Sequence, residues 1–314
     1  MLLTAFTAPV RDALLADDVI EILANADGSL WIERAGIGLT RSDVSLDAAS
    51  RERVIRLVAS SVGETCDRAS PILSAELPGA GERFEGILPP VSEGPCFAIR
   101  KPSAVVFGLD DYVEAGTLTP AVSFALREAI AARLNIVVAG GTSSGKTTFT
   151  NALLAEPAFA TERVVILEDT RELRCSAEDC VALRTWKEGK SLRDLVRSTM
   201  RLRPDRILVG EVRGPEALDL LKAWNTGHPG GITTLHANSA LGALERLEQL
   251  VAEASPRPAE GLIAQGVDVV VFMARDGGVR RVTETLRVSG LDRDGYAVSP
   301  LAAPHLSIIT QGDT

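Results

Sequence analysis

Three glycines, a lysine and several hydroxyl side chains follow an apolar run in the middle of the chain. The stretch is GGTSSGKTTF, which begins at Gly140 and directly follows IVVA. Gly-x-x-x-x-Gly-Lys-Thr is the pattern of a phosphate-binding loop (P-loop), in which glycines let the backbone curl so that its N–H groups point at phosphate oxygens. A helix beginning near Lys146 would add the positive end of its dipole. The amine of Lys146 would reach the β- and γ-phosphates, and the hydroxyl of Thr147 would bind magnesium.

The same residues also fit a simple glycine turn that caps a helix. A true P-loop has to lie between a strand and a helix. IVVA precedes this loop and the helical pattern KTTFTNALLA follows it, which favours phosphate binding. The predicted nucleotide-binding residues are Gly140, Gly141, Thr142, Ser143, Ser144, Gly145, Lys146, Thr147 and Thr148.

Carboxylates end two other apolar runs. VVILEDT places Glu168 and Asp169 after one run, and RILVGEVR places Glu211 after another. The carboxyl ends of parallel strands gather along one edge of a sheet, and ligands bind in the crevice beyond that edge. We therefore expect these acids to lie beside the P-loop, rather than merely capping strand ends at the surface.

Histidines and arginines add further candidates. His228 and His236 flank a predicted strand in GHPGGITTLHANS, where each could contact a γ-phosphate or serve the structure alone. Arg201 and Arg203 lie in RSTMRLRPDRI, which could be a solvated helix face. An arginine beside a nucleotide, including the nucleotide of a neighbouring subunit, would neutralise phosphate charge with its permanently charged planar fork.

The chain is long enough for two domains, at 314 residues. We predict a mixed α+β domain at 1–101, a linker at 102–119 and a larger domain at 120–314. The first domain has helical patterns at 9–15 and 48–63 and strand patterns at 19–25, 30–34, 83–90 and 97–102. In the larger domain, strand and helix patterns alternate, and a hairpin at 267–290 follows them. Such alternation predicts an α/β fold with a largely parallel sheet covered on both faces.

Composition excludes several kinds of protein. The formal net charge is -9 and aromatic residues make up 4%, which argues against direct nucleic-acid binding by charge or by base stacking. The four cysteines have no zinc-ligand spacing, as expected of reduced thiols in a cytoplasmic protein. The N-terminus is a poor signal peptide, and no apolar run approaches the ~20 residues that span a bilayer. We expect any work at a membrane to depend on partner proteins.

Four blocks, in this order, resemble the secretion ATPase superfamily, the hexameric traffic ATPases of type II and type IV secretion and of pilus machines. GGTSSGKTT resembles its Walker A motif, ILEDTREL its Asp box, LRPDRILVGEVRGPEA its atypical Walker B motif and GHPGGITTLHANS its His box. LLKAWNTGHPGG and ALERLEQLV look closest to the conjugal transfer ATPases of the TrbB kind. The resemblance covers essentially the whole chain and implies a RecA-like P-loop NTPase domain behind a smaller α+β domain.

The resemblance also implies roles for individual residues. Glu168 would polarise the attacking water, and Glu211 would hold the magnesium shell through water. His236 would sense the γ-phosphate, with His228 secondary. The arginines that would reach nucleotide at the domain or subunit junction are Arg83 and Arg100, with Arg203 as a weaker candidate. One departure is Ser143, where the family often has glycine; a serine there costs little unless the loop needs a positive φ.

The implied function is a homo-hexameric ATPase that uses ATP and Mg²⁺. It would act peripherally at the cytoplasmic face of the inner membrane, on secretion-channel proteins, to power conjugal transfer of DNA or protein, or pilus assembly. A nucleotide-gated assembly scaffold with little turnover is the alternative, and it would tolerate loss of Glu168. A RecA-like nucleic-acid motor is a third possibility, against which the acidic charge and the scarce aromatics count.

Overall fold

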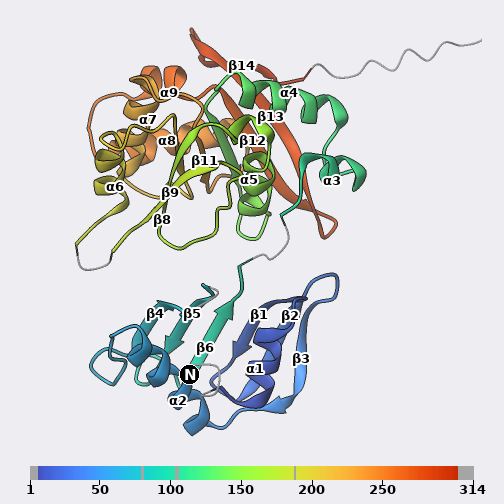
Figure 1. Ribbon diagram of the computed structural model, residues 1–314, viewed down its shortest axis with the longest axis vertical. Coiled ribbons are helices and arrows are strands. Elements are labelled where there is room, and N and C mark those ends of the chain that lie inside the picture. Colours follow the sequence, from blue (N-terminus) through green and yellow to red (C-terminus); the bar gives the residue numbers. More distant parts are fainter. Residues whose placement is uncertain (1–5, 79–80, 103–105, 187–188, 303–314) are drawn as a thin grey trace, which may run out of the picture. The chain divides into compact units, whose positions relative to one another are not determined.

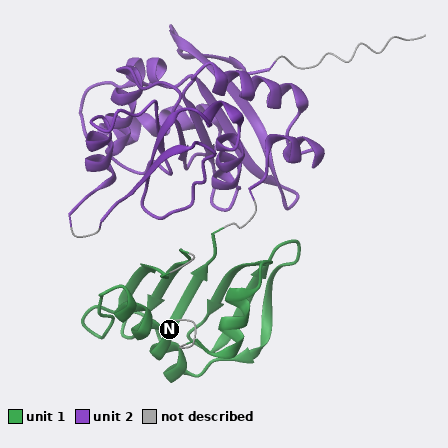
Figure 2. Ribbon diagram, viewed as in Figure 1, with its two compact units in different colours: residues 1–105 green, residues 106–314 purple. Residues whose placement is uncertain are grey.

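The computed structural model describes residues 6–78, 81–102, 106–186 and 189–302. The chain separates into two compact units, residues 1–105 and 106–314 (Figure 2). The division falls inside the predicted linker 102–119, of which residues 103–105 lie outside the described residues.

The first unit is a six-stranded antiparallel sheet with the strand order β3-β2-β1-β6-β5-β4 (Figure 1). Its elements are α1 Ala8–Leu15, β1 Val19–Ala24, β2 Ser29–Arg34, β3 Gly38–Ser45, α2 Ala48–Ser61, β4 Ile72–Glu76, β5 Arg83–Ile87 and β6 Cys96–Arg100. The predicted hairpin is present as β1 and β2. Its turn uses Gly28 at φ 91 and the Asp27 carboxylate, which accepts from the Ser29 N–H at 2.8 Å.

The core of this unit lies between the sheet and its helices. Asp47 precedes α2 and caps it, because its side chain accepts from the Ser50 N–H. Its apolar side chains at helical spacing, Val54 and Val58 among them, are buried in the core. The sequence did not predict β3, because this strand is largely exposed and lacks the alternation of a half-buried strand.

The second unit carries an eight-stranded sheet. Its elements are α3 Leu109–Glu114, α4 Pro120–Ala131, β7 Ile136–Gly140, α5 Lys146–Leu154, the 3₁₀ helix Pro157–Phe159, β8 Arg163–Glu168, β9 Asp179–Arg184, α6 Leu192–Thr199, β10 Arg206–Val209, α7 Glu216–Asn225, β11 Ile232–Leu235, α8 Ala240–Ala252, α9 Glu260–Gly266, β12 Val269–Asp276, β13 Val279–Asp292 and β14 Gly295–Pro300. The strand order is β14-β13-β12-β7-β11-β10-β8-β9. The six strands from β12 to β9 are parallel, and β13 and β14 are antiparallel. The predicted parallel sheet and its terminal hairpin are thus present.

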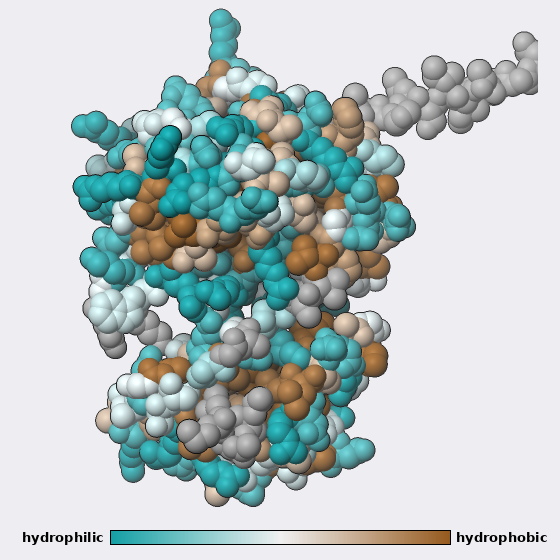
Figure 3. Space-filling view, viewed as in Figure 1, coloured by the Kyte–Doolittle hydropathy of each residue, from teal (hydrophilic) through white to brown (hydrophobic). Residues whose placement is uncertain are grey.

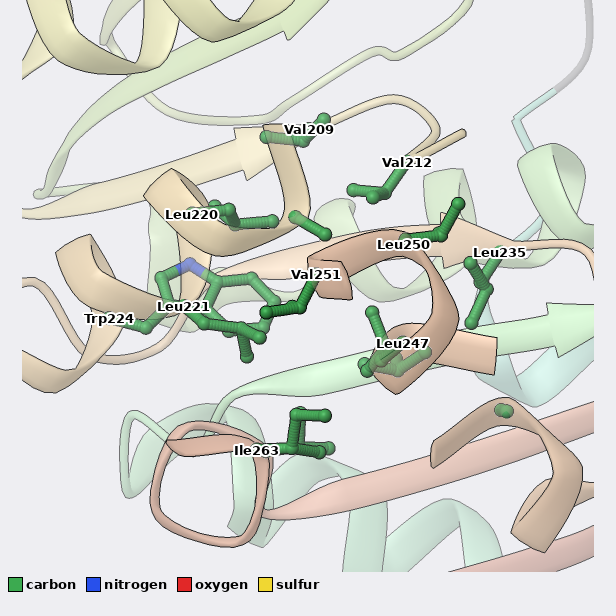
Figure 4. Packing of buried hydrophobic residues seen from close by; sticks show 14 of the residues in the cluster. Val209, Val212, Leu220, Leu221, Trp224, Leu235, Leu247, Leu250, Val251 and Ile263 are labelled. Carbon is green, nitrogen blue, oxygen red and sulfur yellow. The ribbon is translucent and has the colours of Figure 1, made fainter. Parts of the chain in front are cut away.

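Helices cover both faces of this sheet. Side chains of α6, α7, α8 and α9 form one core cluster with the sheet, and those of α3, α4 and α5 form the other. Figure 4 shows the first cluster, where Leu221 and Trp224 of α7 meet Val251 of α8 and Ile263 of α9. A sheet packed on both faces explains why β7, β10 and β11 are buried at every position, including the polar residues Arg206, Thr233 and Thr234.

The structure differs from the sequence analysis within the predicted linker. α3 lies inside residues 102–119, and Leu109 and Leu118 are buried in the core of the second unit. Tyr112 of α3 contacts the ring of Phe149 on α5 edge to face, with the ring centroids 5.1 Å apart. The sequence did not reveal α3, because six residues with three acids give too short a pattern.

The visible surface of each unit is largely polar, as expected from the share of charged residues in the sequence. Hydrophilic residues occupy much of the visible face of each unit, with smaller apolar areas among them (Figure 3). In the part of the chain that the structure describes, no helix combines the length and the apolar character needed to cross a bilayer.

Candidate nucleotide-binding site

The loop between β7 and α5 has the backbone of a phosphate cradle. A Cβ on Gly140 would lie 2.4 Å from the carbonyl oxygen of Met273 and 2.6 Å from Ser144 Oγ, so only glycine fits there. Gly145 has φ 95, in the left-handed region that favours glycine, and α5 begins at the next residue. Both glycines of the motif are therefore required by the geometry of the turn.

Ser143 has a positive φ, which is the condition under which serine is less favourable than the glycine that the family often has at this position. Its φ is 58, so a residue with a side chain occupies the left-handed region in the middle of the loop. Such a conformation costs a non-glycine residue about 1–2 kcal/mol. The loop accommodates this strain, and Ser143 is exposed next to Thr142, which is also exposed.

Lys146 projects its amine into the loop. Only 7% of the residue is exposed. Its Nζ donates to the carbonyl oxygens of Gly140 at 2.9 Å and Gly141 at 3.0 Å, and it lies 3.5 Å from Nδ1 of His236. The lysine charge is thus held at the concave side of the loop, beside the end of β11, where it can meet an anion.

The loop residues fit the phosphates of a nucleotide with Mg²⁺. The first N–H groups of α5 have no acceptor within the helix, and they point toward the loop with Lys146 beside them. Ser144 is 3% exposed, and its Oγ has no hydrogen-bond partner among the described residues. This orphaned buried hydroxyl suits a phosphate oxygen. Thr147 and Thr148 are half-buried in the first turn, where a hydroxyl can bind magnesium.

Two of the three predicted acids, Glu168 and Glu211, lie at the same edge of the sheet as the P-loop, and Asp169 accepts from Thr185 Oγ1 at 2.9 Å. Glu168 is the last residue of β8 and is 4% exposed. Its Oε1 accepts from the N–H groups of Glu172 and Leu173, both at 2.8 Å. Glu211 follows β10, which pairs in parallel with β8. The carboxyl ends of β7, β8, β10 and β11 thus present the lysine, both glutamates and His236 together.

Glu211 contacts two cationic or titratable side chains. Its Oε1 lies 2.9 Å from Nε2 of His236. Its Oε2 accepts from Nε of Arg213 at 2.8 Å and also from Nη2 of that arginine. Burial, and next the charge of Lys146, lower the pKa of His236 below its usual range, which favours the neutral ring at pH 7. Arg213 was not predicted as a site residue, although it stands two residues after Glu211 in the sequence.

Other candidates do not gather at this edge. His228 lies before the amino end of β11, and Arg201 and Arg203 lie before the amino end of β10. Parallel strands place these residues at the edge opposite the P-loop of the same chain. Arg203 has a positive φ of 54.

Arg83 and Arg100 belong to the first unit. They are register partners on β5 and β6, so the two side chains share one face of that sheet. Glu76 pairs with Arg83 on one side, and Glu21 pairs with Arg100 on the other. The two arginines thus form the centre of a row of four charged residues across β4, β5, β6 and β1, with a glutamate at each end. Their contact with nucleotide stays a prediction.

The fold and the loop define the class, an α/β P-loop ATPase of the RecA-like kind. Residues 9–280 match the family described as Type II/IV secretion system protein, and the chain belongs to that family. It is 50% identical to the conjugal transfer protein TrbB of Rhizobium radiobacter over 280 residues, 88% of this chain and 86% of the relative. It is 31% identical to the type IV secretion system protein VirB11 of Bartonella henselae over 322 residues, 88% of this chain and 90% of the relative.

The structure also resembles the ATPase DotB of Legionella pneumophila. The TM-score is 0.63 over 90% of this chain and 81% of that chain, and the identity is 20%, a likeness that shows the fold. The fold class and the secretion ATPase family predicted from the sequence are confirmed.

Proposed function

We propose that this protein hydrolyses ATP in a homo-hexamer and thereby powers conjugal transfer of DNA or protein, or pilus assembly, through a type IV secretion system. The observation that carries the proposal is the meeting of Lys146, Glu168, Glu211 and His236 at one edge of the second sheet. A phosphate cradle alone would bind nucleotide; the carboxylates beside it supply what hydrolysis needs.

Each residue at this edge has a proposed role. Lys146 neutralises the β- and γ-phosphates, and the loop N–H groups orient them. Glu168 polarises the attacking water, because two backbone N–H groups fix its carboxylate at the end of β8. Thr147 and Glu211 hold Mg²⁺, with Glu211 acting through water. When bound, Mg²⁺ neutralises charge that develops on the phosphate oxygens.

His236 is proposed to report the γ-phosphate to the rest of the site. It contacts both Glu211 and Lys146, the two groups whose charge balance changes most when a phosphate is present. A neutral imidazole can donate from one nitrogen while it accepts at the other, which suits a residue between a carboxylate and an anion.

The first unit and neighbouring subunits complete the proposed site. Arg83 and Arg100 reach the nucleotide at a domain or subunit junction, and loss of the γ-phosphate releases them. Arg203 is a weaker candidate that would act on a neighbouring subunit, because it lies at the opposite edge of its own sheet. Release of such a charge bridge lets the units move as rigid bodies. We place the hexamer peripherally at the cytoplasmic face of the inner membrane, in contact with channel proteins.

Phosphate release by the full chain tests this function. Lys146→Ala should abolish Mg-ATP turnover, because residues 140–148 then carry no charged side chain to neutralise the phosphates. Lys222→Ala, an exposed lysine on α7, is the matched control and should keep the wild-type rate. Wild-type turnover in Lys146→Ala would overturn the assignment of the site.

A transfer assay separates the motor from a nucleotide-gated scaffold. Glu168→Gln should bind nucleotide but fail to support conjugal transfer when it replaces the wild-type protein. Normal transfer with that variant would favour the scaffold.

A further inference from the structure

Glu211 is already engaged on both sides by this chain's own residues. Arg213 donates to Oε2 through two nitrogens of its guanidinium, and Nε2 of His236 lies 2.9 Å from Oε1, which has no hydrogen-bond partner among the described residues. Only 18% of the Glu211 side chain is exposed, so there is little room for a third partner without a rearrangement. Any hydrated cation that uses Oε2 must therefore share that oxygen with Arg213 or displace it.

Hydrogen bonds to Glu216 fix the backbone at Arg213, whereas the side chain of Arg213 is largely exposed. Its N–H donates to Oε1 of Glu216 at 2.7 Å, and the N–H of Gly214 donates to the same oxygen at 2.8 Å. Glu216 is buried at the first turn of α7, so this loop is tied to the helix. The Arg213 side chain is 57% exposed. Its guanidinium can therefore change position by rotation of its own side chain alone.

A cavity beside Arg213 offers that second position. It has a volume of about 570 Å³, and Arg213 forms part of its wall. Three carboxylates, those of Asp169, Asp194 and Glu216, line the same cavity. The Ser191 hydrogen bonds lower the pKa of Asp194, so that this group is ionised at neutral pH. If the Arg213 guanidinium leaves Glu211, it can therefore lie close to these carboxylates instead.

Arg213 and a hydrated Mg²⁺ exclude one another at the Glu211 carboxylate, because both are positively charged. A guanidinium and a hydrated divalent cation at the same carboxylate would repel one another, while each alone would stabilise its charge. Mg²⁺ is normally held in such sites by one or two carboxylates together with substrate phosphates. Arg213 is hence placed to compete with the metal and not with the phosphates.

We propose that Arg213 is a positioning residue that competes with Mg²⁺ for the Glu211 carboxylate and sets how much Mg²⁺ the site needs to load nucleotide. The inference rests on the proposed function, since it requires that Glu211 serve the metal. Arg213 occupies Glu211 until the metal arrives with the phosphates, and it then moves toward the carboxylates of the cavity. This pairing keeps the carboxylate neutralised and oriented between turnovers.

Binding of a fluorescent, non-hydrolysable ATP analogue to the full chain tests the proposal. The dissociation constant is measured in EDTA and across a series of Mg²⁺ concentrations. Arg213→Gln should lower the half-saturating Mg²⁺ concentration about two- to fivefold, the size expected for one largely exposed ion pair. Arg213→Lys keeps the charge and should return the midpoint toward the wild-type value. Arg197→Gln is the control, because Arg197 is 55% exposed and pairs with Asp219 instead.

The outcomes separate the two proposals. An unchanged or raised Mg²⁺ midpoint in Arg213→Gln, with normal analogue binding by the wild type, would overturn the competition alone. A midpoint in Arg213→Lys shifted as far as in Arg213→Gln would also overturn it, because charge would then not be the cause. No analogue binding by the wild type would remove the proposed function, and with it this inference.

Discussion

The carboxyl ends of β8 and β10 lie side by side, and each presents a glutamate that is held in a different way. Backbone N–H groups of Glu172 and Leu173 hold Glu168, which is 4% exposed. A side chain holds Glu211: Arg213 donates to its Oε2, while His236 Nε2 lies 2.9 Å from its Oε1. A carboxylate bonded to backbone cannot turn unless the chain moves, whereas one bonded to side chains can exchange partners by rotation. The first arrangement suits a fixed role in chemistry, and the second suits a ligand that comes and goes.

Among the changes that test the contrast between the two glutamates, Glu168→Gln should have the largest effect. The amide oxygen can still accept the two backbone hydrogen bonds, so the fold should persist, but the group can no longer take a proton. We expect turnover to fall about 10²- to 10⁴-fold, the usual contribution of a general base, with the nucleotide dissociation constant nearly unchanged. Phosphate release and analogue binding measure the two quantities. Equal losses in turnover and in nucleotide affinity would mean that Glu168 contributes to nucleotide binding rather than to proton transfer.

Glu211→Gln should have the next largest effect and should act on the metal. A group that holds a metal through water typically contributes about 10- to 100-fold in metal affinity. We expect the Mg²⁺ concentration needed for analogue binding to rise by that factor, while binding in EDTA changes little. If Glu211→Gln lost turnover while its Mg²⁺ midpoint stayed like that of the wild type, Glu211 would be the general base and Glu168 the group that serves the metal.

Gly210→Ala should disturb Glu168 without removing it. A Cβ at Gly210 would lie 3.0 Å from Cγ of Glu168, and that carboxylate is tied to backbone. The backbone of Gly210 is itself held, since its carbonyl accepts from Thr234 Oγ1 at 2.7 Å. We expect turnover to fall about tenfold through misplacement of the carboxylate, with the Mg²⁺ midpoint unchanged. Gly261→Ala, where a Cβ meets nothing within 4 Å, is the control and should be neutral.

Ser143→Gly should have the smallest effect, because its backbone strain involves neither carboxylate. Glycine removes about 1–2 kcal/mol of left-handed strain at φ 58 but costs about 0.5–1 kcal/mol in chain entropy. We expect the free energy of unfolding to rise by up to about 1.5 kcal/mol in urea denaturation. A loss of stability would show that the serine side chain contributes more than its strain costs.

The sequence predicts the site better than it predicts the surroundings of the site. Strand, loop and helix around Gly140 to Lys146 follow from apolar runs and glycines, and the edge position of Glu168 and Glu211 follows from parallel strands. The contact of Arg213 with Glu211 depends on side-chain rotation, which spacing along the chain does not encode. The φ of Ser143 is set by closure of the loop between β7 and α5 rather than by the preference of serine. α3 and β3 escaped prediction because one is short and the other largely exposed.

Calorimetric titration of Mg-ATP into the wild type and into Lys146→Ala tests the central claim most directly. The claim is that the loop between β7 and α5 binds the phosphates of the nucleotide through Lys146 and the loop N–H groups. The account predicts saturable binding by the wild type and binding by Lys146→Ala that is weaker by about 100-fold or more, since a charge-assisted pair of about 3 kcal/mol is lost. Equal affinity of the two proteins, or no uptake of Mg-ATP by folded wild type, would contradict it.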